Sequence, residues 1–262
     1  MNATRAREGW ISFPEKLRTS DRCVLGTWVK IPALETVELL AVAGFDFIVI
    51  DHEHAPMTLE SAYRATVVAQ SLGMHVLVRT PDRSGNYTQR LLDMGVDGLL
   101  IPQVSCGAEA RRVVSEMVHA PRGHRGMGIT SRAGMWGGLS HAEYIRRGTE
   151  ETMRGVQIES LDALGDIEAI LDTPDLNAAF LGSGDLSMST GLSRADPAFQ
   201  AYIDTFLAAT SKRGVPAGTA VGNGAAAVAA AEQGFIFVMV SNDAQMFGQV
   251  ARSVLAASRN SG

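Results

Sequence analysis

The chain has 262 residues, of which 46% are hydrophobic and 19% charged, and its formal net charge is -5. This composition is typical of a globular protein with a well-buried interior, and the acidic balance excludes a basic field for nucleic acid or an anionic membrane. No apolar run approaches bilayer length, and the N-terminus lacks the apolar core of a secretory signal. We therefore expect a cytoplasmic protein, with Cys23 and Cys106 as unpaired thiols.

Short apolar runs alternate with longer segments of helical spacing along the whole chain. The expected strands, in chain order, are VLGTWVK (24–30), FDFIVID (45–51), HVLVRT (75–80), GLLIPQV (98–104), GVQIES (155–160), NAAFLGS (177–183), VPAGTAV (215–221) and FIFVMVS (235–241). Segments between them, such as LETVELLAVAG and FQAYIDTFLAATSKRG, have helical periodicity and end in glycine, as helices often do. Such helices are long enough to connect parallel strands.

Eight strand–helix units predict an α/β protein with a (β/α)₈ TIM barrel as a single domain over residues 1–262. The alternative is a doubly wound open sheet, which ordinarily has fewer units and a glycine-rich phosphate turn after its first strand. Residues 1–20 are expected to form an N-terminal extension, and residues 244–257 a C-terminal helix. The long, glycine-rich connection over residues 119–144 indicates a substrate lid, an interface arm or a plain surface loop.

The apolar strands end in polar and charged residues. In a barrel of this type the active site lies at the carboxyl ends of the strands, because the loops that follow them converge there. The residues at these ends are Lys30, Asp51 with Glu53 and His54, Arg79, Gln103, Gln157 with Glu159, Asp185 and Asn242. A purely structural barrel has little reason to gather carboxylates, imidazoles and a guanidinium on one rim.

Two carboxylates in this set follow neighbouring strands. Glu159 comes after the fifth strand and Asp185 after the sixth, so together they are a plausible anchor for a hard divalent cation such as Mg²⁺ or Mn²⁺. The spacing is equally compatible with two helix caps. In LGSGDLS (181–187) the amides of Gly184 and Asp185 are placed to approach an anion, although an ordinary tight turn explains this stretch nearly as well.

The remaining candidates are basic. Arg79 ends a buried strand and needs an anionic partner, which is either a substrate oxyanion or one of the acids Asp51 and Glu53. His54 is the candidate proton carrier, because imidazole changes charge near neutral pH. His52 is the less certain of the two histidines.

The ordered motifs GFDFIVIDHEHAP, VLVRTP, LLDMGVDGLLIPQV, PRGHRGMG, VQIES and LGSGDLS resemble those of the HpcH/HpaI aldolases, which are metal-dependent class II pyruvate aldolases. The resemblance extends over about residues 25–256. It implies that Glu159 and Asp185 bind a divalent ion, Mg²⁺, Mn²⁺ or Co²⁺. It also implies that His54 is the base, paired with Asp93, and that Arg79 stabilises an enolate.

The same resemblance assigns supporting roles in the site. It gives Asp51 a catalytic role and places Gln157 beside the substrate. It also implies that the loop of Ser183 and Gly184 holds the substrate carboxylate. Two departures from the family pattern concern substrate choice: His52 stands where a small residue is frequent, and Ser183-Gly184 stands where Pro-Ala is common. We expect His52 to affect the aldehyde end of the pocket.

The implied reaction is reversible aldol cleavage of a 4-hydroxy-2-oxo acid to pyruvate, or a related 2-oxo acid, and an aldehyde. The implied assembly is a hexamer with exchanged C-terminal helices. A Schiff-base mechanism would need a lysine on the rim, and Lys30 is the only one placed for it. Two further hypotheses are lysis of an acyl thioester on the same barrel and a binding protein without catalytic activity.

Overall fold

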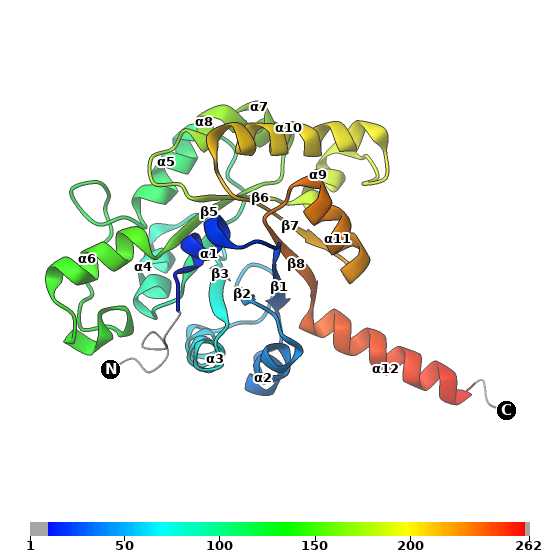
Figure 1. The fold of residues 1–262 in the computed structure, drawn as a ribbon, viewed down its shortest axis with the longest axis horizontal. Coiled ribbons are helices and arrows are strands. Elements are labelled where there is room, and N and C mark those ends of the chain that lie inside the picture. Colours follow the sequence, from blue (N-terminus) through cyan, green and yellow to red (C-terminus); the bar gives the residue numbers. More distant parts are fainter. Residues whose placement is uncertain (1–9, 260–262) are drawn as a thin grey trace.

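The computed structural model describes residues 10–259 and closes eight parallel strands into a barrel in the order β1 to β8 (Figure 1). The strands are β1 (Val24–Val29), β2 (Phe47–Asp51), β3 (His75–Arg79), β4 (Gly98–Ile101), β5 (Met153–Ile158), β6 (Ala178–Leu181), β7 (Ala217–Val221) and β8 (Phe237–Asn242). Because β1 also pairs with β8, the predicted (β/α)₈ barrel is confirmed and the open sheet is excluded. The fourth strand ends earlier than predicted, which leaves Gln103 in the following loop.

Helices connect the strands around the barrel. They are α1 (Phe13–Thr19), α2 (Leu34–Ala43), α3 (Leu59–Ser71), α4 (Gly85–Asp93), α5 (Gly107–Ser115), the 3₁₀ helix η1 (Arg132–Gly137), α6 (His141–Glu150), α7 (Leu161–Gly165), α8 (Ile167–Leu171), α9 (Ser183–Thr190), α10 (Pro197–Arg213), α11 (Gly224–Gln233) and α12 (Asp243–Arg259). Gly44, Gly214 and Gly234 end α2, α10 and α11 in the left-handed conformation that glycine adopts without steric cost. Within residues 10–259, no helix combines the length and apolarity needed to cross a membrane.

Aromatic side chains fill the barrel interior. The rings of Phe47 and Phe237 lie 6.3 Å apart, and Phe13 of α1 packs 5.0 Å from Phe47. A Cβ at Gly26 or Gly218 would collide with these two strand phenylalanines, so the glycines make room for the rings. The amino-terminal end of the barrel is thereby closed by apolar contacts, whereas the carboxyl ends of the strands carry the polar residues.

The last helix leaves the barrel instead of packing on it. Figure 1 shows α12 extending away from the other helices, and its side chains Phe247, Val250 and Val254 are 61–73% exposed. The expected C-terminal helix is therefore present, and its docking on a neighbouring subunit stays a prediction. Residues 1–9 of the expected N-terminal extension lie outside the described residues, and α1 forms much of the remainder.

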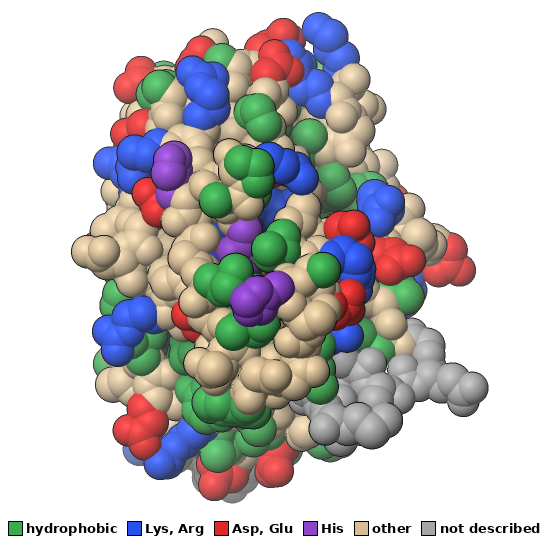
Figure 2. Space-filling model, turned by 90° about the vertical axis from the view of Figure 1, so that its left-hand side faces the viewer, with side chains coloured by type: hydrophobic (Ala, Val, Ile, Leu, Met, Phe, Trp, Pro, Cys, Tyr) green, Lys and Arg blue, Asp and Glu red, His purple; other side chains and the backbone are tan. Residues whose placement is uncertain are grey.

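The long connection before β5 lies on the flank of α4 and not over the rim. The Gly126 N–H donates to Gln89 Oε1 at 3.0 Å, and Arg132 donates to the Met94 carbonyl at 3.0 Å. None of its residues lines the cavity at the rim, so the connection is no lid over its own barrel. Figure 2 shows the flank on the α6 side, where acidic and basic side chains are interspersed without a broad field of either sign.

Candidate active site

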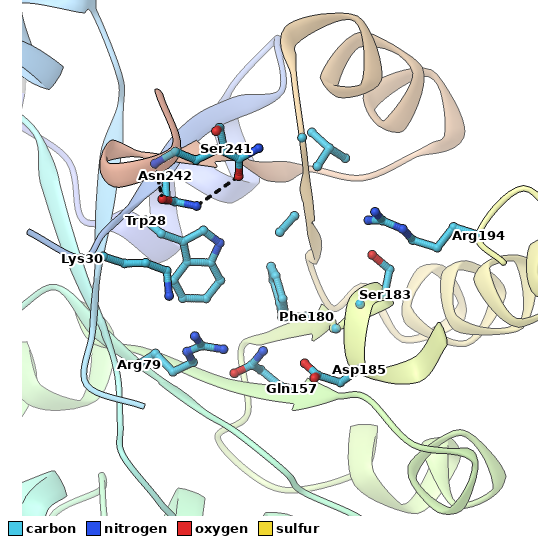
Figure 3. Close-up of a pocket in the computed structure, with 16 residues that line it drawn as sticks. Trp28, Lys30, Arg79, Gln157, Phe180, Ser183, Asp185, Arg194, Ser241 and Asn242 are labelled. Carbon is cyan, nitrogen blue, oxygen red and sulfur yellow. Dashed lines mark hydrogen bonds between the residues drawn. The ribbon is translucent and has the colours of Figure 1, made fainter. Parts of the chain in front are cut away.

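A cavity of about 340 Å³ opens at the carboxyl rim. It is lined by Trp28, Lys30, Arg79, Gln157, Phe180, Gly182, Ser183, Gly184, Asp185, Arg194, Ala220, Val221, Gly222, Ser241, Asn242 and Gln245. In Figure 3, Lys30 and Arg79 enter from one side, Asp185 and Arg194 from the other, and Phe180 lies between them. Some of the rim residues predicted from the strand ends therefore line one cavity.

A buried ion-pair cluster orients Arg79. Its Nε and Nη2 donate to the two oxygens of Asp51 at 2.9 and 2.7 Å, and its Nη1 lies 3.1 Å from Glu53 Oε2. Lys30 forms an ion pair with the same Asp51 carboxylate, and the Arg79 guanidinium lies 4.3 Å from the Trp28 ring centroid. Burial by itself raises the pKa of Asp51, but hydrogen bonds and charges from Arg79 and Lys30 hold it well below its usual range. Asp51 and Glu53, the two acids expected as partners of Arg79, therefore both form ion pairs with it.

The two predicted metal ligands come from neighbouring strand ends and repel each other. Glu159 follows β5, and Asp185 lies in the first turn of α9 after β6, the strand paired with β5. Burial and the negative charges of Asp185 and Glu53 raise the pKa of Glu159 to about 7, although the Gln103 N–H, which donates to Glu159 Oε1 at 2.6 Å, opposes this shift.

The alternative role of Glu159 and Asp185 as helix caps is not supported by the structure. The N-cap of α7 is Ser160, whose hydroxyl accepts the Ala163 N–H, and the N-cap of α9 is Gly182. A Cβ at Gly182 would lie 2.8 Å from Glu159 Cβ, so glycine there leaves space for the Glu159 side chain. Neither Glu159 nor Asp185 is therefore needed to cap a helix.

The residues present fit a hard divalent cation. Two carboxylates that repel each other in a desolvated site are stabilised by a cation, and oxygen ligands suit Mg²⁺, Mn²⁺ and Co²⁺. Within residues 10–259, no three His, Cys, Asp or Glu side chains converge into a complete metal cage. An ion bound here would therefore take its other ligands from water and substrate. Gln157 adds a buried amide oxygen on the cavity wall that accepts no hydrogen bond from any described residue.

The loop predicted to hold a carboxylate is the amino terminus of α9. Ser183, Gly184 and Asp185 are its first three residues, so their backbone N–H groups have no acceptor within the helix. All three residues line the cavity. Free N–H groups and the helix dipole both favour an anion at this point.

The two histidines occupy different environments. His54 is exposed on the loop after β2, with Nε2 at 3.8 Å from Glu53 Oε2 and its backbone N–H donating to Asp51 Oδ1 at 3.2 Å. His52 is buried against the Tyr87 ring at 5.6 Å, and this burial lowers the pKa of His52. Neither histidine is among the residues that line the cavity, and the buried contact of His52 with Tyr87 favours a packing role over the substrate contact expected for it.

Asp93 lies on a different part of the barrel from His54. It is the last residue of α4, which begins at the rim after β3 and runs back toward the amino-terminal end of the barrel. There, Asp93 accepts a hydrogen bond from Gln89 at 2.8 Å and lies 3.7 Å from Arg125 Nη2. One chain therefore does not bring the expected pair of His54 and Asp93 together.

The sequence profile of the HpcH/HpaI aldolase/citrate lyase family matches residues 25–254. The chain belongs to this family. The 2-keto-3-deoxy-L-rhamnonate aldolase of Escherichia coli O1:K1 is 32% identical in an alignment 251 residues long that covers 93% of this chain and 91% of that protein. The 2-dehydro-3,6-dideoxy-6-sulfogluconate aldolase of Pseudomonas putida is 32% identical over 235 residues, 89% of this chain and 91% of that protein.

A solved HpcH/HpaI aldolase/citrate lyase family protein from Burkholderia cenocepacia J2315 has the same fold. The two structures superpose with a TM-score of 0.86 at 29% identity, over 94% of this chain and 98% of that one. The resemblance inferred from the sequence motifs is confirmed, and the HpcH/HpaI chain is an aldolase-type lyase.

Proposed function

We propose that this HpcH/HpaI chain catalyses the divalent-metal-dependent, reversible aldol cleavage of a 4-hydroxy-2-oxo acid to pyruvate, or a related 2-oxo acid, and an aldehyde. The observation that carries the proposal is that Asp185 and an oriented Arg79 line one cavity, and that the charges of both act on the partly buried Glu159 carboxyl. The two named relatives support it, because both are aldolases whose substrate names carry a 2-keto or 2-dehydro group.

Glu159 and Asp185 would hold the metal ion. When bound, the ion would supply Lewis acidity that draws electrons from the 2-oxo acid and makes C3 easier to deprotonate or to release as a carbanion equivalent. The raised pKa of Glu159 fits this role, because binding of a cation replaces a proton on a carboxyl that is costly to ionise.

Arg79 would stabilise the negative charge that develops on the enolate oxygen. Its guanidinium is held by two hydrogen bonds to Asp51, so little reorganisation is needed during the reaction. The N–H groups at the start of α9, from Ser183 and Gly184, would bind the substrate carboxylate, and Gln157 would orient the oxo acid from the wall of the cavity.

His54 would move the proton of the C4 hydroxyl, directly or through water. Its exposure on the loop after β2 leaves the imidazole accessible to substrate and water, and imidazole as a group suits a general base. Because one chain holds His54 and Asp93 at opposite ends of the barrel, the pairing implied by the family requires Asp93 from a neighbouring chain.

The assembly proposed from the family is a hexamer with exchanged C-terminal helices. Its support is a mainly apolar groove of about 480 Å³ between α2 and α11, where the chain leaves β8 without packing a helix on the barrel. Val228 lines this groove and is 61% exposed, and Val42, the chain neighbour of the lining residue Ala43, is 86% exposed. The apolar face of α12 from a second copy matches this groove in chemistry and would cover both surfaces.

The test is a cleavage assay on protein stripped with EDTA. We expect pyruvate release from 4-hydroxy-2-oxo acids, measured with lactate dehydrogenase, to vanish on stripping and to return with Mg²⁺, Mn²⁺ or Co²⁺. Acyl-CoA thioesters offered in parallel test the alternative reaction, lysis of an acyl thioester. EDTA-insensitive cleavage, or cleavage of thioesters alone, would contradict the proposal.

A further inference from the structure

The loop after β4 contains a residue in a strained backbone conformation beside a proposed metal ligand. Gln103 has φ 57°, in the left-handed region that residues with a side chain rarely adopt. It is exposed, whereas its neighbours Pro102 and Val104 are buried. Packing of its own side chain therefore does not explain the strained conformation. Residues held in this way are concentrated at functional sites, where the surrounding structure keeps them in place.

Hydrogen bonds hold the Gln103 loop on several sides. Arg83 Nη1 donates to the Gln103 carbonyl at 2.9 Å and to Glu109 Oε1 at 2.6 Å. The other oxygen of Glu109 accepts the backbone N–H and the hydroxyl of Ser105, each at 2.9 Å. The Gln103 side chain donates to Glu53 Oε1 at 2.9 Å. These contacts fix the strained loop, and none of them involves a proposed metal ligand.

The backbone held in this way is directed at Glu159. The Gln103 N–H donates to Glu159 Oε1 at 2.6 Å. Glu159 Oε2 lies beside Gly182, because a Cβ on this glycine would be 2.9 Å from that oxygen. Gly182 lines the cavity and is the N-cap of α9, the helix that carries Asp185 in its first turn. The two oxygens of Glu159 therefore have different surroundings: Oε1 faces the loop, and Oε2 lies at the cavity side.

We propose that Gln103 is a positioning residue for the metal site, whose left-handed peptide binds Glu159 Oε1 and leaves Oε2 free to coordinate the divalent ion. This inference rests on the proposed function. A carboxylate with one oxygen fixed by a backbone N–H has fewer orientations to lose when a cation binds. Groups that orient metal ligands in this way typically change metal affinity tenfold to hundredfold. Arg83 and Glu109 act on the ion only through the Gln103 peptide.

Two substitutions of Gln103 test the requirement for a left-handed backbone. Glycine adopts this conformation without steric cost, a β-branched valine strongly disfavours it, and neither keeps the side-chain amide. Mn²⁺ affinity of EDTA-stripped protein is measured from the electron paramagnetic resonance signal of the unbound ion. We expect Gln103→Gly to stay within about threefold of the native affinity, and Gln103→Val to bind Mn²⁺ roughly tenfold more weakly.

Arg83→Met tests the same peptide from outside the metal site. Loss of a positive charge near a cation site by itself favours the cation, and so does a Glu109 carboxylate left without its partner. Loss of the hydrogen bond to the Gln103 carbonyl acts in the opposite direction, and we expect Mn²⁺ binding to weaken roughly threefold to tenfold. Arg111→Met is the matched control, because Arg111 is an exposed arginine of α5 outside the cavity, and it should keep the native affinity.

Equal Mn²⁺ affinities of Gln103→Gly and Gln103→Val would overturn the inference, and so would native or tighter binding by Arg83→Met. Thermal unfolding of the stripped variants shows whether each one folds. A lowered midpoint with native Mn²⁺ affinity would overturn the inference too, because Gln103 would then act on stability alone. Should Gln103→Val fail to fold, Arg83→Met against Arg111→Met decides. Native Mn²⁺ binding that Glu159→Gln and Asp185→Asn leave unchanged would instead overturn the metal site of the proposed function, and the inference with it.

Discussion

Glu159→Gln should stabilise the metal-free protein at alkaline pH. The Glu159 carboxyl has an ordinary pKa of 4.5, and burial with nearby acids raises it to about 7 in the folded chain. Between these pH values the folded state holds a proton that the unfolded chain has lost, so stability falls as pH rises through this window and is level above it. The glutamine keeps an oxygen for the Gln103 N–H and cannot ionise.

The size of the effect follows from the shift in pKa. One pKa unit corresponds to about 1.4 kcal/mol, so the shift of Glu159 from 4.5 to about 7 gives roughly 3 kcal/mol, which partial access of water reduces to ~2 kcal/mol. For a chain of this size that corresponds to roughly 5 °C in the unfolding midpoint. We expect the variant to match the native protein near pH 5 and to exceed it by this amount at pH 8.

Thermal unfolding of EDTA-treated protein between pH 5 and pH 8 measures this difference. Adding Mn²⁺ should reverse the order, because only the native protein then gains stability from binding. Glu109→Gln is a matched control at the rim: the Ser105 backbone hydrogen bond lowers the pKa of Glu109, so no gain at pH 8 is expected. If the unfolding midpoints of Glu159→Gln and of the native protein changed with pH in the same way, Glu159 would hold no such proton in the folded chain.

Three further predictions concern the ion-pair cluster, the mechanism and the assembly. Asp51→Asn should lower the free energy of unfolding by about 3 kcal/mol in denaturant titrations, because Arg79 and Lys30 lose the buried carboxylate that they share and only Glu53 still pairs with Arg79; a loss below about 1 kcal/mol would argue against the cluster. Borohydride with pyruvate should leave the mass of the protein unchanged, whereas an adduct on Lys30 would overturn the metal mechanism. Phe247→Asp, on the exposed apolar face of α12, should reduce the assembly to smaller species in size-exclusion chromatography. Gln249→Asp on the opposite face should not, and equal behaviour of the two variants would exclude docking through this face.

Much of the site was predictable because strand order fixes it. Glu159 and Asp185 follow consecutive strands of a closed barrel, so their proximity follows from the topology alone. The same holds for Asp51 and Arg79, which face each other across β2 and β3. In these cases, correct placement of the strands was sufficient to place the side chains.

Other features depend on details that strand order does not determine. Gln103 adopts a left-handed backbone conformation, φ 57°, and this directs its N–H to Glu159, which no residue preference at that position indicates. Arg194 comes from a turn between helices, which the strand pattern does not place at the cavity. The apolar pattern of α12 does not by itself reveal that the helix leaves the barrel, although the family resemblance implied exchanged C-terminal helices. Asp93 was assigned by motif alone, although its place at the end of α4 puts it away from the rim.

The proposed mechanism depends on one divalent ion that binds between Glu159 and Asp185 and activates a 2-oxo acid. A crystal structure of the protein with Mn²⁺ and pyruvate, using the anomalous signal of manganese, would locate both. We predict a single ion held by these two carboxylates, with the pyruvate carboxylate at the start of α9 and Arg79 facing its keto oxygen. An ion bound elsewhere, or pyruvate bound away from this ion, would contradict the mechanism.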